Sequence, residues 1–513
     1  MSGKKVVIIG SGINGLVAAN YLSKKGFSVS VIEKNNHTGG ACTYKTKIIE
    51  NQTIDYAYGA TVLGMMPNFI FNETGLSKNV KIFAPKHPKL VYFPDSKVST
   101  RIYQDYKKLD KELKNKWGEK GNLESFRIDE DKVVDFIREG CRKGETPTLE
   151  KARNSLGQAL TDLWIKGSAK NLLDHYFSSD KTKIYMGMTA IESGSSSIKN
   201  NGTAFTIPLM DSGSVFNGYW GYVKGGIWQI SHEITKINKK IGVHFHMSSN
   251  ISSIDSNKMK ISFKKENKNY EIDYDYLIFA TDPITPSKIL KNKDLQSKIE
   301  DNDFLGTSGK ITAFFKNPVI WKENSPYKNS DSAFRFIFSN QTLSDFEKSS
   351  QSVIKNSNDY SPGYIQVYAE GAAQRVLNNK EPFDKLIFFI KNIKYGKTGD
   401  QLNQVKEKVK EIMFKYIKNT EDCVSTEFLS PRDLNQIFYF PKGNIDHMAL
   451  NENQNYSDRH FSKNIKKSFY LYGDYENIFY CGAGAYPCGS VAGTTGYMCA
   501  KQLKRLIDSN WCN

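Results

Sequence analysis

The chain has 513 residues, of which 39% are apolar and 12% aromatic, and it carries a formal net charge of +17. This composition allows two or three domains with a large core and excludes a chain that is disordered by composition. The positive charge favours a solvated lysine surface, with attraction to an anionic membrane surface or an acidic partner as the alternative. Because the basic residues are spread along the chain without a nucleic-acid motif, no nucleic-acid partner is expected.

The cellular compartment is predicted from apolar runs and cysteine usage. No apolar run approaches the roughly 20 residues of a transmembrane helix. The run VVIIG near the N-terminus is too short for a signal peptide. The seven cysteines are scattered without CxxC spacing, which favours a reducing compartment. We therefore expect a cytoplasmic protein, with peripheral membrane contact as a further expectation.

The first predicted unit is the segment VVIIGSGINGLVAANYLSKKGFSVSVIEKNNHTGG, at residues 6–40. Its branched run, residues 6–9, predicts a buried parallel strand. Residues 16–25 have helical periodicity, with Gly26 as the residue that ends the helix. Residues 28–32 predict a second strand that leads into Glu33. Strand, glycine turn, helix and strand in this order predict the start of a nucleotide-binding domain.

The glycines of this turn, Gly10, Gly12 and Gly15, form a GxGxxG motif. One glycine makes the tight turn, one admits a pyrophosphate to the backbone, and one lets the helix pack on the strand. The helix N-terminus supplies amide donors and a partial positive charge. Glu33 follows 18 residues beyond Gly15, where a carboxylate accepts from ribose hydroxyls and disfavours a 2′-phosphate. The pattern predicts a dinucleotide site.

The rest of the chain predicts a second domain and a return to the first. Residues 106–117 are charged and have helical character. Residues 218–254 read as a glycine loop, a helix from about 227 to 240 and a strand, and residues 274–283 read as an apolar strand and turn, so both pieces are expected in the nucleotide domain. Between residues 286 and 455 the alternating runs KITAFFK, AFRFIFS, YIQVYAEG and KLIFFIKNI predict an antiparallel sheet. Its aromatic residues are expected in a core, with an apolar ligand channel as the alternative.

Several segments resemble, in their expected order, the phytoene dehydrogenase-related flavoproteins: EKNNHTGGACTY, IDYAYGA, LLDHYFSSDKTKIYMG, GYWGYVKGGIWQISHEI, LSPRDLNQIFYFPKGNIDHM and IFYCGAGAYPCGSVAGTTG. This superfamily includes phytoene desaturases, carotenoid isomerases, retinol saturases and a pyridine nucleotide-disulfide oxidoreductase-like branch, which is the nearest. The resemblance implies an α/β fold with a Rossmann-like FAD-binding domain of the GR2 type, formed by residues 1–60, 216–285 and 461–513. An inserted α+β substrate domain with an antiparallel sheet would take residues 61–215 and 286–460.

The resemblance also implies FAD as the cofactor and a set of residues that would hold it. Those expected to hold the adenosine and pyrophosphate are Gly10, Ser11, Gly12, Gly15, Glu33, Lys34, Gly39, Gly40 and Ala41. Ile251, at the end of the returning strand, would touch the adenine. The turn expected near the cofactor is Ala280, Thr281 and Asp282. The residues expected over the ribityl chain and flavin ring are Gly482, Ala483, Gly484 and Val491.

Two side chains are candidate catalytic residues. His447 matches a histidine of the family pattern, either as a general acid/base or as a structural hydrogen-bonding group. Tyr486 stands where the family usually has histidine in GaGxHPGGG, and Cys488 and Ser490 replace glycines there. A tyrosine with an ordinary pKa of about 10 is a weak base at neutral pH, and we expect Tyr486 in the active-site wall. Cys481 and Cys488 lie seven residues apart without a neighbouring histidine, so no metal site is expected.

The predicted function is that of an FAD-dependent oxidoreductase that transfers hydride, by desaturation or saturation, on a hydrophobic polyene or lipid-like substrate. No second GxGxxG motif follows a strand, so oxygen or a quinone is the expected electron acceptor. Three alternatives stay open: a redox-neutral, flavin-dependent cis–trans isomerase of a polyene, an amine oxidase, and a catalytically diverged flavoprotein scaffold.

Overall fold

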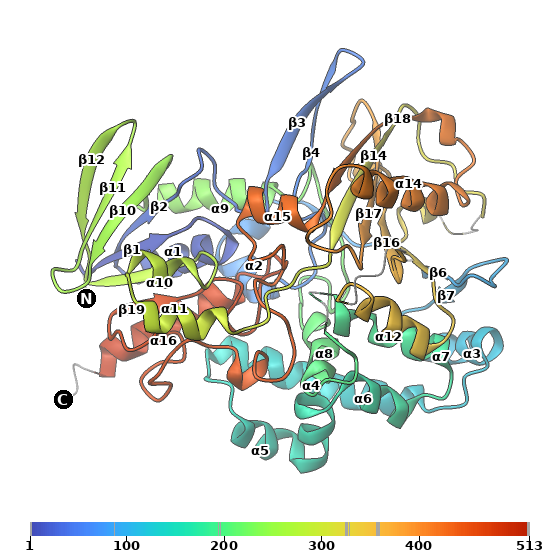
Figure 1. Cartoon of the computed structure of the whole chain (residues 1–513), viewed down its shortest axis with the longest axis horizontal. Coiled ribbons are helices and arrows are strands. Elements are labelled where there is room, and N and C mark those ends of the chain that lie inside the picture. The colour runs from blue at the N-terminus through green and yellow to red at the C-terminus, as the bar shows by residue number, and fades with distance from the viewer. Residues whose placement is uncertain are drawn as a thin grey trace.

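The computed structural model of the chain describes residues 3–86, 88–192, 194, 196–323, 327, 329–354 and 360–509. Cys512 and the last four residues of the predicted nucleotide domain lie outside this part. The described chain forms two large sheets and a layer of helices (Figure 1). No helix in it is long and apolar enough to span a bilayer.

The first large sheet has five strands, all parallel, in the order β19-β13-β1-β2-β9. Its strands are β1 (Lys5–Ile9), β2 (Ser28–Ile32), β9 (His244–His246), β13 (Tyr276–Phe279) and β19 (Ile478–Tyr480). Helix α1 (Ile13–Lys24) packs against α9 (Gln229–Lys240) and α16 (Thr494–Ser509). The strands are short and almost wholly apolar because helices cover the sheet, as a buried parallel sheet requires. Three distant pieces of the chain thus build one Rossmann-like sheet, and the predicted fold class is confirmed.

One prediction for this region is wrong in detail. Ile251 belongs to β10 (Ser249–Asp255), which pairs with β11 (Lys260–Lys265) and β12 (Lys268–Asp273) in a separate antiparallel sheet. The strand that returns to the parallel sheet is β9, just before it. The chain turns out of the sheet at Met247 and Ser248, and Ser248 has a positive φ of 54°. A sharp turn of this kind leaves no periodic signal in the sequence.

The second large sheet has seven strands in the order β18-β14-β17-β16-β15-β6-β7, and all its pairs are antiparallel except β15 with β6. Its strands are β6 (Lys89–Tyr92), β7 (Thr100–Ile102), β14 (Gly309–Phe315), β15 (Arg335–Phe338), β16 (Tyr364–Tyr368), β17 (Asp384–Ile390) and β18 (Cys423–Leu429). The four predicted alternating runs are β14 to β17, so the predicted sheet is confirmed. One face packs with α14 (Asp400–Phe414) on a core of its own. The other face is turned inward and carries polar side chains.

The remaining helices form a layer below the second sheet and short connections between the sheets (Figure 1). The helices of that layer are α3 (Tyr106–Trp117), α4 (Leu123–Lys143), α5 (Leu149–Leu160), α6 (Ala169–Tyr176), α7 (Asp180–Gly187), α8 (Thr206–Met210) and α12 (Leu343–Gln351). The connections are α2 (Asn68–Glu73), α10 (Thr285–Ile289), α11 (Lys293–Glu300), α13 (Glu370–Val376) and α15 (Pro431–Phe438). Two further strand pairs are the protruding hairpin β3 (Tyr44–Ile49) and β4 (Gln52–Ala57), and β5 (Ile82–Phe83) with β8 (Tyr222–Val223). The charged segment 106–117 is helix α3, as predicted.

Candidate functional site

The first glycine turn brings backbone close to backbone at the carboxyl end of β1. Gly10 has a φ of 98°, and a Cβ added there would lie 2.9 Å from the Ala280 carbonyl oxygen. A Cβ on Gly15 would lie 2.4 Å from the Gly10 carbonyl oxygen, so this glycine lets α1 pack on the strand. A Cβ on Gly12 would meet nothing within 4 Å. Gly12 therefore exposes backbone to open space, as a site for a pyrophosphate requires.

The N-terminus of α1 is open to an anion. Gly12 is the residue before the helix and offers no side-chain cap, and the first turn contains no acidic residue. The first amides of a helix lack carbonyl partners within it and carry a partial positive charge. Phosphate groups bind at such helix ends. The turn can thus bind a diphosphate through backbone groups alone.

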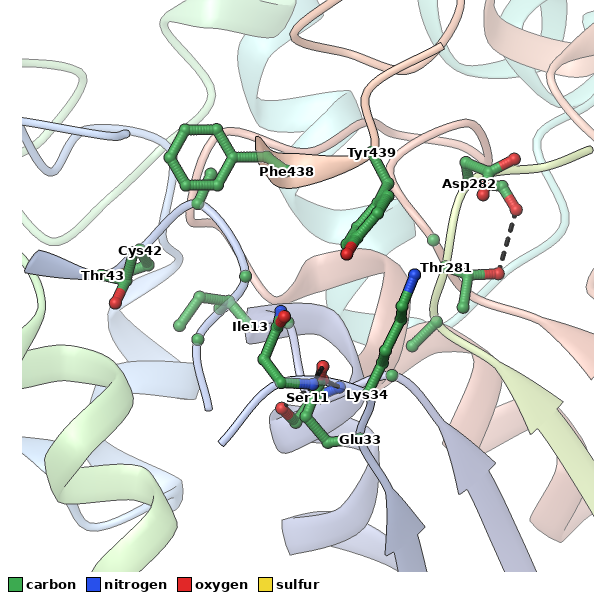
Figure 2. Close-up of a pocket in the computed structure, with 18 of the residues that line it drawn as sticks. Ser11, Ile13, Glu33, Lys34, Cys42, Thr43, Thr281, Asp282, Phe438 and Tyr439 are labelled. Carbon is green, nitrogen blue, oxygen red and sulfur yellow. Dashed lines mark hydrogen bonds between the residues drawn. The ribbon is translucent and has the colours of Figure 1, made fainter. Parts of the chain in front are cut away.

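Glu33, at the end of β2, is held in place by three hydrogen bonds. Its Oε2 accepts from the Ser11 amide at 2.8 Å and from Ser11 Oγ at 2.7 Å, and its Oε1 accepts from the Asn35 amide at 2.8 Å. The side chain is buried, and Figure 2 shows it beside Ser11 under the glycine turn. A carboxylate fixed here keeps acceptor capacity for ribose hydroxyls.

The second glycine pair is attached to the first motif. The Gly39 amide donates to the Ser11 carbonyl at 2.8 Å, and Gly39 has a φ of 114°. A Cβ at Gly39 would lie 2.5 Å from the Cys42 carbonyl oxygen. Gly40 also has a positive φ, of 58°. Gly39 and Gly40 therefore allow residues 39–43 to pack against the glycine turn.

These elements surround a cavity of about 740 Å³, within the range of roughly 300–1,000 Å³ of small-molecule and cofactor sites. The predicted site residues that line it are Gly10, Ser11, Gly12, Glu33, Lys34, Gly39, Gly40, Ala41, Ile251, Ala280, Thr281, Asp282, His447, Gly482, Ala483 and Val491. Those that do not are Gly15, Gly484 and Tyr486. The structure thus brings most of the predicted residues together from distant parts of the chain.

The cavity also has an aromatic wall that the sequence did not single out. Phe438, Tyr439 and Phe440 follow from the end of α15, and Tyr58 faces them from the base of the β3–β4 hairpin. The Tyr58 and Phe438 ring centroids are 5.5 Å apart, at an interplanar angle of 66°. Figure 2 shows Phe438 and Tyr439 above the glycine turn. The sequence does carry a signal for this wall, namely three consecutive aromatic residues at 438–440 after a helix that begins with a capping box. The side chains of three successive residues cannot all face one core, so at least one of them must lie elsewhere.

The C-terminal glycine segment closes another side of the cavity. Gly482, Ala483, Gly489, Ser490 and Val491 line it. Ser490 and Val491 have positive φ values of 56° and 58°, a strained conformation for residues with a Cβ. The residue Gly484 points elsewhere, and its amide donates to Tyr480 Oη at 3.3 Å. This wall thus combines two glycines with three residues that have small or medium side chains.

Tyr486 does not lie in this wall, which corrects the predicted position. It is buried against other rings, with centroids 5.7 Å from Tyr456 and 6.4 Å from Phe205. Its hydroxyl faces the Cys141 thiol at 4.0 Å, and burial raises its pKa well above the ordinary value. A tyrosine in such surroundings keeps its proton. It packs in the core and cannot act as an acid or base in the cavity.

His447 lines the cavity, but its protonation does not suit acid/base catalysis. Burial, together with the Arg459 guanidinium, lowers the pKa of His447 to about 3. Its ring packs on Phe440, with 5.1 Å between centroids, and its Nδ1 is buried without a hydrogen-bond partner. A catalytic base works best with a pKa near the working pH. Of the two predicted roles, this geometry favours the structural one.

The turn after β13 is held by its own carboxylate. Asp282 Oδ1 accepts from the amides of Ile284 and Thr285, both at 2.9 Å. Thr281 Oγ1 donates to the Asp282 carbonyl at 3.0 Å, the contact drawn in Figure 2. Burial raises the pKa of Asp282. The acid therefore fixes the start of α10, and the turn presents mainly backbone to the cavity.

A second cavity, of about 1,000 Å³, lies on the opposite side of the C-terminal segment. Pro487, Ala492 and Thr494 line it, whereas the intervening residues 489–491 line the first cavity. Its other walls are α2 and the last turns of α4, and its apolar lining includes Met65, Phe69, Ile137 and Cys141. The segment 487–494 thus contributes residues to both cavities.

The inner face of the seven-stranded sheet carries three lysines beside apolar side chains such as Phe314 and Ile387, and most aromatic residues of the sheet are buried as expected. Lys310, Lys385 and Lys391 all point to this face and are almost completely buried. Lys310 Nζ donates to the carbonyls of Ala57 at 2.5 Å and Gly59 at 3.0 Å, on both sides of Tyr58. Burial lowers the pKa of Lys310 to about 7. Lys310 thus fixes the backbone on both sides of Tyr58, a residue of the aromatic wall.

Comparison with known proteins agrees with this site. Residues 8–69 match the family of NAD(P)-binding Rossmann-like domains. The chain is 26% identical to the 1-hydroxycarotenoid 3,4-desaturase of Flavobacterium sp. (strain P99-3) over 363 residues, 66% of this chain and 70% of the relative. It is 24% identical to the 4,4'-diaponeurosporene oxygenase of Staphylococcus aureus (strain USA300) over 319 residues, 60% of this chain and 62% of the relative.

Solved structures show the same fold over the whole length. A putrescine oxidase structure superposes with a TM-score of 0.60 at 15% identity, covering 99% of both chains. Cyclohexylamine oxidase from Brevibacterium oxydans superposes with a TM-score of 0.59 at 14% identity, covering 99% of this chain and all of that one. Identities this low show the fold alone.

The fold has a Rossmann-like parallel sheet and a second, mostly antiparallel sheet, and the first cavity lies at the glycine turns of the parallel sheet. The desaturase relatives bear out the predicted resemblance to the phytoene dehydrogenase-related superfamily and the prediction of an enzyme. The assignment to one branch of that superfamily stays a prediction.

Proposed function

We propose that the chain binds FAD in the first cavity and transfers hydride to or from a hydrophobic, polyene or lipid-like substrate. The observation that carries the proposal is the cavity itself, in which Gly12 exposes backbone to open space beside a fixed carboxylate, Glu33. These groups fit an adenosine diphosphate moiety: a helix N-terminus for the phosphates and a carboxylate for the ribose. The names of the desaturase relatives support the kind of substrate.

Bound FAD would supply the hydride chemistry, since flavins accept and donate hydride without a protein nucleophile. The protein's part is to bind and orient the cofactor and to exclude water. Glu33 would hold the ribose, the α1 amides the phosphates, and the wall of Tyr58, Phe438 and Phe440 would keep water from the cofactor. His447 stays neutral near pH 7 and would fix the loop beside it.

The second cavity is the proposed approach for the substrate. Its lining combines apolar residues, among them Met65, Phe69 and Ile137, with charged ones such as Arg138, and the segment 487–494 contributes residues to both cavities. Oxygen or a quinone is the proposed electron acceptor. The shared segment supports this arrangement, because a substrate there would lie close to the first cavity.

Two measurements test the proposed function. Protein purified with its cofactor is denatured, and released FAD is identified by chromatography and fluorescence. FAD-loaded protein is then mixed anaerobically with lipid and polyene extracts, and loss of the oxidised flavin spectrum is followed. Absence of FAD after reconstitution would overturn the cofactor assignment. Bound FAD that no extract reduces would contradict the oxidoreductase and favour the diverged scaffold.

A variant pair locates the site. Glu33→Ala removes the proposed ribose acceptor and should weaken FAD binding by about 10- to 100-fold, since hydrogen bonds to charged groups contribute roughly 1.5–3 kcal/mol. Glu271→Ala, on exposed β12, is the matched control and should bind FAD as the wild type does. Equal affinity of all three proteins would place the dinucleotide elsewhere.

A further inference from the structure

Two exposed side chains meet across the mouth of the first cavity. Lys34 follows Glu33 at the end of β2, and Tyr439 directly follows α15. The Lys34 ammonium lies 4.5 Å from the centroid of the Tyr439 ring. Figure 2 shows the lysine rising from the nucleotide-binding sheet and the tyrosine ring descending towards it. Both residues line the cavity and both are exposed to solvent, so they lie where the cavity opens.

The backbone of Tyr439 is strained, and burial does not explain why a tyrosine stands there. Its φ and ψ are 60° and 28°, the left-handed conformation in which helices usually end with glycine or asparagine. A residue with a Cβ pays an energy cost there. The ring is 42% exposed, so little apolar surface is removed from water in return. The conformation does direct the ring at Lys34.

Lys34 has no competing partner in the described part of the chain. None of the ion pairs there involves it, although most other pairs of this lysine-rich protein join neighbouring surface groups. A lysine over an aromatic face is attracted by the ring quadrupole. The two residues come from segments some 400 positions apart in the sequence. Their contact therefore ties the nucleotide-binding sheet to the segment after α15.

We propose that Lys34 and Tyr439 form a latch over the adenosine end of the dinucleotide, and that opening this latch limits how fast the cofactor leaves. The proposal rests on the proposed function, because the latch needs FAD beneath it. The adenosine end is assigned because Lys34 is adjacent to Glu33, the ribose acceptor. A ligand that leaves between these two side chains would have to part the ring from the lysine.

The test uses reconstituted full-length protein and measures the rate of FAD release after dilution, followed by fluorescence. Lys34→Met and Tyr439→Gly should each release FAD about two- to fivefold faster, the factor expected for an exposed cation–π contact. Tyr439→Phe keeps the aromatic face and should release FAD at the wild-type rate. The double variant Lys34→Met/Tyr439→Gly should be no faster than the faster single variant.

Thermal unfolding of the FAD-free proteins separates a latch from a merely structural contact. Tyr439→Gly relieves the left-handed strain, so we expect a melting temperature at or above that of the wild type together with faster release. Lys239→Met, which removes a similar contact with Phe245 away from the cavity, is the control and should release FAD normally.

Each outcome decides the proposal. Wild-type release rates in Lys34→Met and Tyr439→Gly, or effects that multiply fully in the double variant, would overturn the latch while leaving FAD binding intact. Failure of the wild type itself to bind FAD would overturn the proposed function and the latch together.

Discussion

Two regions of the molecule are built on opposite physical principles. The first, the cradle, is the glycine turn at residues 10–15 with the N-terminus of α1 and Glu33, and the second is the inner face of the seven-stranded sheet. The cradle is made of backbone: glycines without side chains, a helix N-terminus and one fixed carboxylate. The sheet face carries buried lysines among apolar side chains, and each lysine is hydrogen-bonded or paired with a carboxylate. Lys385, completely buried, lies 2.9 Å from Glu381 and 3.6 Å from Glu370.

This difference teaches how the two regions respond to change. At Gly10, Gly15 and Gly39 an added Cβ would lie 2.4–2.9 Å from a backbone oxygen, which cannot move aside as a side chain can. A buried charge network tolerates no lost partner, because the remaining charge stays out of water. The cradle should therefore fail through crowding and the sheet face through an unpaired charge. Four variants probe this contrast.

The largest effect is expected at the sheet face. Lys385→Met leaves Glu370 and Glu381 buried without their cation and should lower the free energy of unfolding by about 3–5 kcal/mol. Burial raises the pKa of Glu381 to about 7. The loss should therefore be larger at pH 8, where the Glu381 carboxyl is mostly charged in the wild type, than at pH 5. Urea unfolding at the two pH values measures it.

The control for this variant is an exposed pair of the same kind. Lys415→Met removes a lysine 3.8 Å from Glu411, and both side chains are more than half exposed. Surface ion pairs contribute about 0–1 kcal/mol, so this change should be nearly neutral. A comparable loss in both variants would show that burial is not what makes Lys385 necessary.

In the cradle, Gly15→Ala should fail through crowding. The new Cβ would lie 2.4 Å from the Gly10 carbonyl oxygen and 2.9 Å from Ala280 Cβ, so α1 must shift away from the strand. We expect a loss of up to about 3 kcal/mol in unfolding free energy, and weakened FAD binding. Denaturant unfolding and flavin titration measure the two effects.

Gly140, inside α4, is the matched control. A Cβ there meets nothing within 4 Å, and its φ is not positive. Gly140→Ala should therefore stabilise the protein by about 0.5–1 kcal/mol, as alanine does in a helix interior. Destabilisation by both changes would contradict the crowding argument for the cradle.

Features built from residues close together in the sequence could be predicted, whereas features that join distant residues could not. The cradle was predictable because its parts are local: strand, Gly10, Gly12, Gly15, helix and Glu33 lie within 30 residues. The alternating runs of the second sheet were predictable because period-two patterning is also local. The pairing of β6 with β15, in contrast, joins residues more than 200 positions apart and has no local signature.

The candidate site divides in the same way. The resemblance predicts that the C-terminal glycines lie near a cofactor, but it does not predict which of them line the cavity: Gly482 does and Gly484 does not. Tyr486 was misplaced because a motif position says nothing about the neighbours, here Phe205 and Tyr456, that bury its ring. The charges on the inner face depend on partners such as Glu370 that only the tertiary fold supplies.

His447 combines features of both regions, because it lines the cavity and its side chain is nevertheless kept neutral by burial. Its folded pKa of about 3 is below the unfolded value of about 6.5, so the unfolded state binds more protons between these values. This contribution to stability is present above pH 6.5 and is lost as the pH falls. From pH 7 to pH 5 the loss should be about 2 kcal/mol.

The variant His447→Gln cannot titrate and should show a flatter dependence of unfolding free energy on pH over this range. His244→Gln, on exposed β9, is the control and should keep the wild-type slope. An unchanged slope in His447→Gln would mean that this histidine is solvated and open to acid/base chemistry after all.

The smallest effect is expected in the C-terminal segment, where a residue with a Cβ adopts a backbone conformation that favours glycine. Ser490 replaces a glycine of the family pattern and takes a φ of 56° in the cavity wall. Ser490→Gly relieves strain of roughly 1–2 kcal/mol, partly offset by the greater freedom of glycine in the unfolded chain, so we expect a net gain of about 0.5 kcal/mol. Ser490→Ala keeps the strained backbone and should give no gain, as denaturant unfolding can show. If alanine stabilises as much as glycine, the hydroxyl rather than the backbone is responsible. If only glycine does, the departure at this position is one of backbone strain.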